Sequence, residues 1–484
     1  MNRRAFLQSA AAGLFASTAL GAKGACRAPA GPLASNSESI FPIIDAHCHI
    51  FNASDLAIEG FIKHSVLHAS GDHPLDAAIA AFDYQLQSAA PSFEEENALL
   101  DAVLRGDPIP EEFDRTGPSL DDFDNFLDHL AKSRPELLRG GEKQEIPLFG
   151  EGILFNALRW AWILTRHRLH IMQLMFNTFS EVELFVPAIV DMDLWLSDHA
   201  ETSVPNQIRL YEKLVRISQG RIMPLAPFDP WRQVEAERAG TDTPLEWLQD
   251  AVLHRGFAGV KLYPTMGFRA EGNAELRPRW FYRPLDSALE ELYEWCQQER
   301  VPVLAHANAS WGSQRGFEER AGPEYWRRAL ERFPDLRISF GHFGGDNDLL
   351  SRGMESRCWD FANLMQEYPN AFADIGFHDI GFPSTPDCDV EKYFALMREL
   401  AAEFPAAIDH IMYGSDWHMI AQTSGNGQYF TTAFERFASH WPEAQSGVFN
   451  ATARRWLDLD DSQSPARRRL DTFNSGHPIT TPSA

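Results

Sequence analysis

The sequence predicts an α/β fold, a (β/α)8 TIM barrel with a large helical insertion after its first strand. Eight short runs rich in β-branched and other apolar residues recur along the chain, and each ends in polar residues, Gly or Pro. Amphipathic stretches such as 284–300 and 323–333 separate the later runs. Strands and helices that alternate in this way form parallel strands joined by helical crossovers. The runs are 40–46, 184–191, 222–228, 258–263, 301–305, 336–341, 371–376 and 410–415.

The interval between the first and second runs is much longer than the others. It holds residues 54–180, with acidic segments and a stretch, 154–176, whose apolar residues recur at helical spacing. A structureless loop of this length would be unusual in a compact domain, so we expect a helical cap over the barrel mouth. A basic cluster in this segment is interpreted as the solvated face of a helix, the alternative being that one or two of its cations bind an anionic substrate. The cluster comprises Arg159, Arg166, His167, Arg168 and His170.

The N-terminus has the features of an export signal. Arg3 and Arg4 precede a short, uncharged, Ala-rich run, which predicts a signal over residues 1–25 and resembles the twin-arginine type. We therefore expect a periplasmic or secreted protein. Residues 26–40 have the composition of a linker, and Cys26 at its start is either an ordinary linker residue or a lipidated one.

The composition limits the classes of partner. Lys and Arg total 43 against 68 for Asp and Glu, giving a net charge of −25, which argues against nucleic acid or an anionic membrane surface as the main partner. The 5 cysteines show no paired spacing, so neither a zinc knuckle nor a disulfide framework is indicated. We assign residues 41–461 to the barrel domain and 462–484 to a disordered tail, because the latter segment lacks apolar periodicity.

Four of the eight runs end in residues that bind metals. Alternate residues of a strand share one side, so His47 and His49 of the first run project together. Three later runs end in His306, His342 and Asp416. Because the carboxyl ends of barrel strands meet at one face, these side chains predict a site for a divalent cation.

Six motifs in this order make the sequence resemble the amidohydrolase superfamily. Within it, the closest similarity is to the branch of TIM-barrel metal-dependent hydrolases that also holds decarboxylases of the aminocarboxymuconate semialdehyde type. The insertion at 54–180 is not part of the common pattern. The motifs are IIDAHCHIF (43–51), GVKLYP (259–264), PVLAHAN (302–308), SFGHFGG (339–345), YGSDWH (413–418) and NATARRWLDL (450–459).

This resemblance implies roles for the strand-end residues. His47, His49, His306 and Asp416 would be metal ligands, and Asp416 would also carry a proton from the metal-bound water to the leaving group. His342 would activate the water in a protein with one ion, or bind the second ion in a protein with two. The catalytic residues would be Asp416 and His342, and the cofactor one divalent ion rather than two, zinc first and manganese or iron otherwise.

Other residues near these motifs are candidates for the site. Lys261 stands where members with two ions carry a carboxylated, metal-bridging lysine; the alternative is a structural or anion-binding lysine. Arg315, Tyr263 and Trp417 are expected to bind substrate, and Asp374, His378 and Asp379, around the seventh run, are expected to contact the ligands.

The reaction favoured by this pattern is hydrolysis of a C–N, C–O or lactone bond of a small organic substrate by a metal-activated water. Metal-dependent nonoxidative decarboxylation is the alternative on the same scaffold. A binding protein that kept the barrel without turnover is a third possibility. A small-molecule substrate is the expected partner, with no nucleic acid and no stable membrane span, and the sequence leaves a homo-oligomer open.

Overall fold

The computed structural model describes residues 41–68, 76–107 and 159–476. The predicted export signal and linker, 1–40, lie outside the described residues, as do 69–75 and 108–158 of the predicted insertion. No helix in the described ranges has the length and apolarity needed to cross a membrane.

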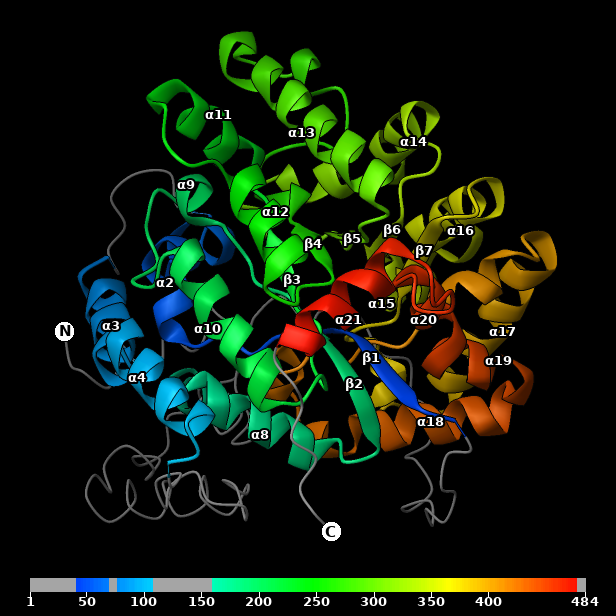
Figure 1. Cartoon of the computed structure of the whole chain (residues 1–484). Helices are drawn as coiled ribbons and strands as arrows, with labels where there is room; N and C mark the ends of the chain where they lie inside the picture. The colour runs from blue at the N-terminus through cyan, green and yellow to red at the C-terminus, as the bar shows by residue number, and fades with distance from the viewer. Residues whose placement is uncertain (1–40, 69–75, 108–158, 477–484) are drawn as a thin grey trace, which may run out of the picture.

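Each of the eight apolar runs contains or overlaps a strand, and the strands run parallel (Figure 1). β1 pairs with β2, and β3 to β8 form one six-stranded sheet in sequence order. The strands are β1 Ile43–Cys48, β2 Val182–Pro187, β3 Leu225–Pro227, β4 Gly259–Leu262, β5 Val303–His306, β6 Ile338–Gly341, β7 Ala371–Asp374 and β8 Ile411–Met412.

Backbone hydrogen bonds join the two sheets into a ring. Between β2 and the start of β3, Phe185 N–H donates to the Arg221 carbonyl and Met223 N–H donates to the Phe185 carbonyl, both at 2.9 Å. Between β8 and β1, Ala46 N–H donates to the Tyr413 carbonyl at 2.9 Å. The eight strands therefore close in sequence order, and the predicted TIM barrel is confirmed.

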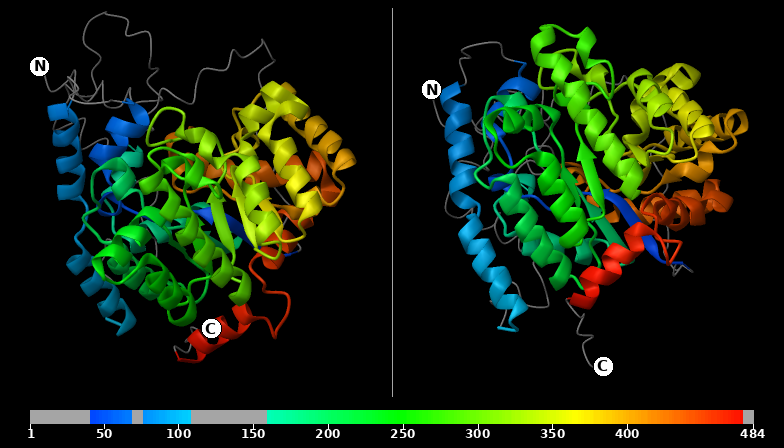
Figure 2. Two further views of the ribbon diagram at one scale, coloured as in Figure 1. Left: turned by 90° about the horizontal axis from the view of Figure 1, so that it is seen from above. Right: turned by 45° about the horizontal axis from the view of Figure 1, so that its top comes forward.

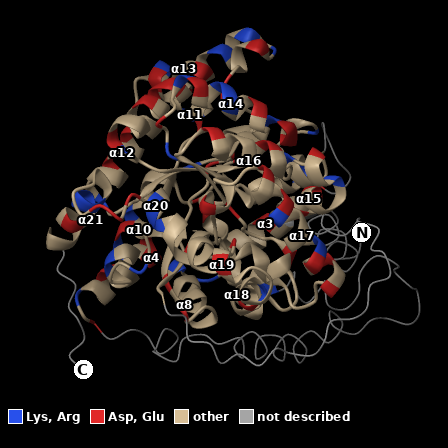
Figure 3. Ribbon diagram, turned by 90° about the vertical axis from the view of Figure 1, so that its right-hand side faces the viewer, with Lys and Arg blue, Asp and Glu red and all other residues tan. Residues whose placement is uncertain are grey.

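Helices surround the barrel, with charged residues concentrated on their outer faces (Figures 2 and 3). The longest of them, α13, buries Leu285, Leu289, Leu292 and Cys296, whose spacing of three or four residues places them on one face. The helices that follow β2 are α9 Asp193–Leu196, α10 Val204–Ile217, α11 Pro230–Ala239, α12 Pro244–His254, α13 Arg279–Glu299, α14 Pro323–Arg332, α15 Asp346–Arg352, α16 Arg357–Glu367, α17 Asp387–Glu403, α18 Tyr429–His440, α19 Pro442–Ser446 and α20 Thr452–Trp456.

The described part of the insertion is helical, as predicted, and it reaches the carboxyl ends of the strands. The Phe61 ring packs 5.4 Å from that of Trp311, which follows β5, and Trp160 Nε1 donates to Nδ1 of His418, which follows β8, at 3.1 Å. The insertion therefore contacts the end of the barrel where active sites of this fold lie. Its elements are η1 Ala53–Asp55, α2 Ile58–Gly60, η2 Phe61–Val66, α3 Asp76–Ala89, α4 Phe93–Leu104, a helical segment over 159–164 and α8 Arg168–Thr178.

The interpretation of the basic cluster as a solvated face is wrong for two of its members. Arg168 is fully buried, and His170 is buried beside it on α8. The guanidinium of Arg168 forms ion pairs with Asp55 of η1 and Glu96 of α4, both buried. Two carboxylates around one cation neutralise a charge that would otherwise be too costly to bury.

The predicted disordered tail is wrong over α21, Pro465–Gly476. This helix packs against α12, and its Ala466 and Phe473 are buried. The Phe473 ring lies so close to Gly256 that a Cβ there would be 3.0 Å from it. Burial of Phe473 and Ala466, with the hydrogen bond from Arg469 to the Glu299 carbonyl, therefore holds the helix to the barrel. Residues 477–484 lie outside the described part of the chain.

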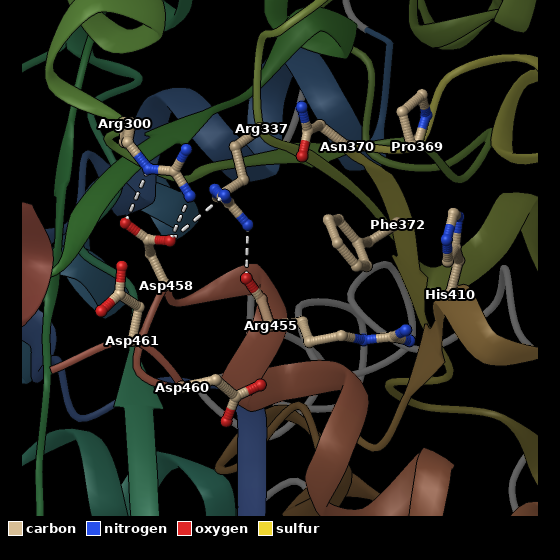
Figure 4. Close-up of a pocket in the computed structure, with 10 residues that line it drawn as sticks. All are labelled: Arg300, Arg337, Pro369, Asn370, Phe372, His410, Arg455, Asp458, Asp460 and Asp461. Carbon is tan, nitrogen blue, oxygen red and sulfur yellow. Dashed lines mark hydrogen bonds and ion pairs between the residues drawn. The ribbon is translucent and has the colours of Figure 1, made fainter. Parts of the chain in front are cut away.

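A cavity of about 240 Å³ lies at the amino ends of the strands (Figure 4). Four of its lining residues, Arg300, Arg337, Asn370 and His410, stand shortly before β5, β6, β7 and β8. In its wall, the buried carboxylate of Asp458 accepts from Arg300 Nε at 2.9 Å and from Arg337 at 3.3 Å. In TIM barrels this end of the fold usually contributes to stability rather than to catalysis.

Asp458→Asn is expected to lower the free energy of unfolding by about 2 kcal/mol, the range for a hydrogen bond to a charged group. The substitution removes the anion that Arg337, almost fully buried, faces in this wall. The control is Asp460→Asn, because Asp460 is half-exposed in its pair with Arg454 and should change stability by less than about 0.5 kcal/mol. Urea denaturation measures both, and equal effects would contradict the assignment.

Candidate active site

The residues predicted to bind metal lie at the carboxyl ends of the strands. His47 is in β1 and His49 follows it, Lys261 is in β4, His306 ends β5, His342 follows β6 and Asp416 follows β8. All six are buried. Segments far apart in sequence therefore bring imidazoles, a carboxylate and an amine to one end of the barrel.

His47, His49 and Asp416 form the group best suited to a metal ion. Asp416 Oδ1 lies 3.2 Å from His49 Nε2 and 3.8 Å from His47 Nε2. One ligand atom from each residue lies within 4.8 Å of the other two. Two imidazole nitrogens and one carboxylate oxygen are a donor set that fits zinc, manganese or iron and leaves coordination positions open.

Hydrogen bonds turn both imidazoles of this group toward Asp416. His49 Nδ1 donates to the Ala188 carbonyl at 2.8 Å, and His47 Nδ1 donates to Asp374 Oδ1 at 3.1 Å. These partners assign the proton to Nδ1 in each ring and leave the Nε2 lone pair available. A neutral imidazole oriented in this way is what a metal ligand requires.

Lys261 faces the same lone pair. Its Nζ lies 2.9 Å from His47 Nε2, and the side chain is 2% exposed. Burial lowers the pKa of Lys261 to about 8, against the opposing effect of the carboxylates of Asp374 and Asp416. An unmodified ammonium here competes with a metal for His47, whereas a carbamate would offer an anionic oxygen. Carboxylation of Lys261 stays a prediction.

His342 lies between His47 and His306. Its ring centroid is 4.8 Å from that of His47 and 4.8 Å from that of His306. His342 Nδ1 donates to the Gly376 carbonyl at 2.9 Å, which leaves Nε2 as the acceptor. The backbone of His342 is left-handed, with φ 63°, as is that of Asp416, with φ 58°. Such conformations cost of the order of 1 kcal/mol per residue and concentrate at functional turns.

His306 is adjacent to this group but differently held. Its ring stacks on Tyr263 with centroids 4.3 Å apart and an angle of 13°. His306 Nε2 lies 3.1 Å from Ser310 Oγ, so a hydrogen bond occupies the nitrogen that would bind metal. Among the described residues, the metal-compatible groups do not include His306. Its assignment as a ligand stays a prediction.

The protonation states of these side chains are those a divalent cation needs. Burial, with the nearby Lys261, lowers the pKa of His47 to about 4, and burial lowers the pKa of His306 well below its usual range. Burial alone would raise the pKa of Asp416, but the adjacent His49, together with His342 and His47, outweighs it and lowers this pKa. At neutral pH the imidazoles of His47 and His306 are therefore neutral and the carboxylate of Asp416 is ionised.

The residues predicted to bind substrate are placed differently from one another. Tyr263 is near the ligands through its stack on His306. Trp417 is buried in the hydrophobic core, edge-on to Phe179 at 5.6 Å, which gives it a packing role. Arg315 is exposed on the loop after β5. Substrate binding by Tyr263 and Arg315 stays a prediction.

Two contacts of the site were missed in the sequence. Ser310 gives no signal in the sequence, because a loop serine carries no pattern of its own. The fully buried Asp45 accepts from the N–H groups of His47 and Ser415, at 3.2 and 2.9 Å, and so ties β1 to the loop that carries Asp416. Asp45 could have been predicted from the sequence, because it precedes His47 by two residues on the same strand and alternate residues of a strand point to the same side.

Comparisons with known proteins agree with this geometry. The amidohydrolase family model matches residues 234–459. A search of curated proteins found no match.

The chain is similar to several solved structures at low identity. A zinc-bound amidohydrolase from Burkholderia multivorans is 12% identical with a TM-score of 0.41, covering 65% of this chain and 93% of that one. A probable 2-pyrone-4,6-dicarboxylic acid hydrolase from Acinetobacter baumannii is 13% identical with a TM-score of 0.36, covering 60% and 88%. A 2,6-dihydroxybenzoate decarboxylase from Rhizobium is 15% identical with a TM-score of 0.37, covering 59% and 88%. Similarity at this level says nothing about the reaction. With the match of residues 234–459 to the amidohydrolase family and the donor set at its strand ends, the chain is similar to the metal-dependent enzymes of the amidohydrolase superfamily.

Proposed function

We propose that the protein is a hydrolase that cleaves a C–N, C–O or lactone bond of a small organic substrate with water activated by a divalent cation, zinc first and manganese or iron otherwise. One observation carries the proposal: His47 and His49 both present Nε2 to Oδ1 of Asp416, within 3.8 and 3.2 Å. A cation held there lowers the pKa of a water molecule to about 7.

Two residues of this chain would handle protons in the reaction. Asp416, ionised and aimed at the ligand group, would accept a proton from the attacking water and deliver it to the leaving nitrogen or oxygen. His342, with Nδ1 committed to the Gly376 carbonyl, would accept a hydrogen bond from the water at Nε2 and orient it. Because burial keeps His342 neutral, it can serve as this acceptor at neutral pH.

Metal analysis of the purified protein tests the number of ions. We expect one zinc per chain, its loss in His47→Ala, and its retention in His342→Asn, in which asparagine suits the left-handed backbone at φ 63°. Proportional loss in both variants would instead indicate two ions. Zinc at a hundred times its dissociation constant should also raise the free energy of unfolding of the wild type by about 2.7 kcal/mol.

The reaction itself is tested by a substrate panel of amides, esters, lactones and aromatic or enoic carboxylic acids. Hydrolysis products should appear with the metal-loaded enzyme, and carbon dioxide should not. Carbon dioxide release without hydrolysis would contradict hydrolysis and favour decarboxylation. A preparation that binds no zinc, manganese or iron would contradict the metal-dependent mechanism as a whole.

We also propose that the protein is exported by the twin-arginine route to the periplasm or beyond. The support is the Arg3-Arg4 pair and the uncharged, Ala-rich segment that follows it. A site that takes its metal before export suits this route, since it carries folded proteins.

A further inference from the structure

The carboxylate of Asp374, at the end of β7, lies next to the proposed ligands but outside the group that they form. It is fully buried, and its Oδ1 accepts three hydrogen bonds. The donors are His47 Nδ1 at 3.1 Å, His342 N–H at 3.1 Å and Gly376 N–H at 3.0 Å. One oxygen therefore joins β1 and the loops after β6 and β7.

Asp374 could instead be taken for a metal ligand, because a nitrogen of His47 and one of His342 lie within 4.8 Å of its carboxylate. The hydrogen bonds exclude that role for Oδ1. A cation bound to this oxygen would meet three N–H groups, and the nitrogen that His47 turns toward it is the one that carries the proton. Both features make Oδ1 an acceptor that orients a ligand rather than a ligand, whereas Oδ2 has no hydrogen-bond partner among the described residues.

The surrounding backbone is built close around this oxygen. A Cβ at Gly376 would lie 2.9 Å from Asp374 Oδ1, and one at Gly414 would lie 3.3 Å from it and 2.8 Å from the Cβ of His47. Side chains at these two positions would displace the carboxylate or the imidazole. The two glycines thus fix the distance between Asp374 and His47.

We propose that Asp374 is a positioning residue that holds His47 with its proton on Nδ1 and Nε2 free for metal, while it anchors the backbone of His342 at the same oxygen. This inference rests on the proposed metal-dependent function. The Nε2 of His47 that is left free in this way lies 2.9 Å from Lys261 Nζ and 3.8 Å from Asp416 Oδ1. Loss of the carboxylate would release the imidazole to rotate or to exchange tautomers.

The test measures zinc affinity and the tautomer of His47 in the purified full-length protein. Asp374→Ala should weaken zinc binding 10–100-fold in competition with a chelator, the effect usual for the partner of a metal-ligating histidine. Nitrogen-15 spectra of labelled histidine should show the proton of His47 on Nδ1 in the wild type and a mixture of tautomers in Asp374→Ala. Asp374→Asn keeps the shape of the side chain and one acceptor oxygen, so its zinc affinity should lie between those of the wild type and Asp374→Ala.

The matched control is Asp346→Ala. Asp346 is also a buried carboxylate, 4% exposed, and it accepts from the N–H of Asp379 in the loop after β7. A merely structural role for Asp374 predicts equal effects of the two alanine variants on zinc affinity and no change in the tautomer of His47; that result would overturn the inference. Wild-type zinc affinity in Asp374→Ala would overturn it as well.

These outcomes separate this inference from the proposed function. If Asp374→Ala binds zinc normally while His47→Ala does not, the metal site stands and the positioning role fails. If the wild type binds no metal, the proposed function fails, and the tautomer of His47 in the metal-free protein still decides whether Asp374 orients it. Should Asp374→Ala not fold, Asp374→Asn provides both readouts, and unchanged affinity and tautomer in it would contradict the inference.

Discussion

Replacing Arg168 by methionine is expected to lower the free energy of unfolding by about 3–5 kcal/mol, the range for removing one partner of a buried ion pair. Arg168 is fully buried, and its Nε donates to Asp55 at 2.9 Å while its guanidinium also pairs with Glu96. Methionine fills much of the same volume, so the loss comes from charge. Two carboxylates, 3% and 1% exposed, would remain without a cation.

The loss should depend on pH in a defined direction. Burial raises the pKa of Asp55 above its value in the unfolded chain, and Arg168 opposes that shift. Without Arg168 the folded-state pKa rises further, so the folded protein holds a proton that the unfolded chain releases above roughly pH 4. Stability of the variant relative to wild type should therefore fall as pH rises from about 4 to 8.

Denaturant unfolding at both pH values measures this effect, with Arg105→Met as the control. Arg105 also pairs with a carboxylate, Asp107 at 2.9 Å, but its side chain is 63% exposed. Its replacement should change stability by less than about 1 kcal/mol at either pH. Adding Asp55→Asn and Glu96→Gln to Arg168→Met should recover part of the loss, because no uncompensated charge then stays buried. No recovery would contradict the electrostatic origin.

The barrel could be predicted because each strand carries its own signal. Even β8, only Ile411–Met412, stands in the apolar run 410–415, which Asp416 follows directly. His47 and His49 point to the same side because side chains alternate along a strand with a period of two residues. Asp416 lies beside them because the carboxyl ends of the barrel strands converge.

The burial of Arg168 could not be predicted, because its partners are remote. Asp55 and Glu96 lie 113 and 72 residues from Arg168 in the chain. Helical spacing predicts which face of a helix is polar, but it does not predict which cation pairs with a buried acid. α21 was missed for a related reason. Its Phe473 ring packs on Gly256, in the loop after α12, and one aromatic residue makes no periodic pattern.

The hydrogen bond between His306 and Ser310 shows a third limit. The position of His306 at the end of β5 could be predicted from the run that precedes it. The direction of its ring is set by Tyr263 and Ser310, which are contacts of side chains and not of strands. Sequence patterns thus located the site residues, and local hydrogen bonds decided which of them present a free lone pair.

Asp416→Asn is expected to reduce kcat about 10²–10⁴-fold on any substrate that the panel identifies, the contribution usual for a positioned general base. Asparagine has the shape of aspartate and tolerates the left-handed backbone at φ 58°, so the turn after β8 should survive. The amide cannot accept a proton from water at neutral pH. Steady-state kinetics on the metal-loaded variant, with its metal content measured alongside, separates loss of the base from loss of the ion.

Asp458→Asn is the matched control for this variant. Asp458 is also buried, and its backbone has the same φ of 58°, but it lies at the amino ends of the strands, in the wall of the cavity there. If the carboxyl ends of the strands serve catalysis and the amino ends serve stability, one substitution should lower kcat and the other should lower the free energy of unfolding. Asp416→Asn should lose turnover and keep most of its unfolding free energy, since Lys261 still has the carboxylate of Asp374 near it. Asp458→Asn should lose about 2 kcal/mol of stability and keep kcat at 25 °C. A wild-type kcat in Asp416→Asn with bound metal would remove Asp416 from proton transfer and leave it as a ligand alone.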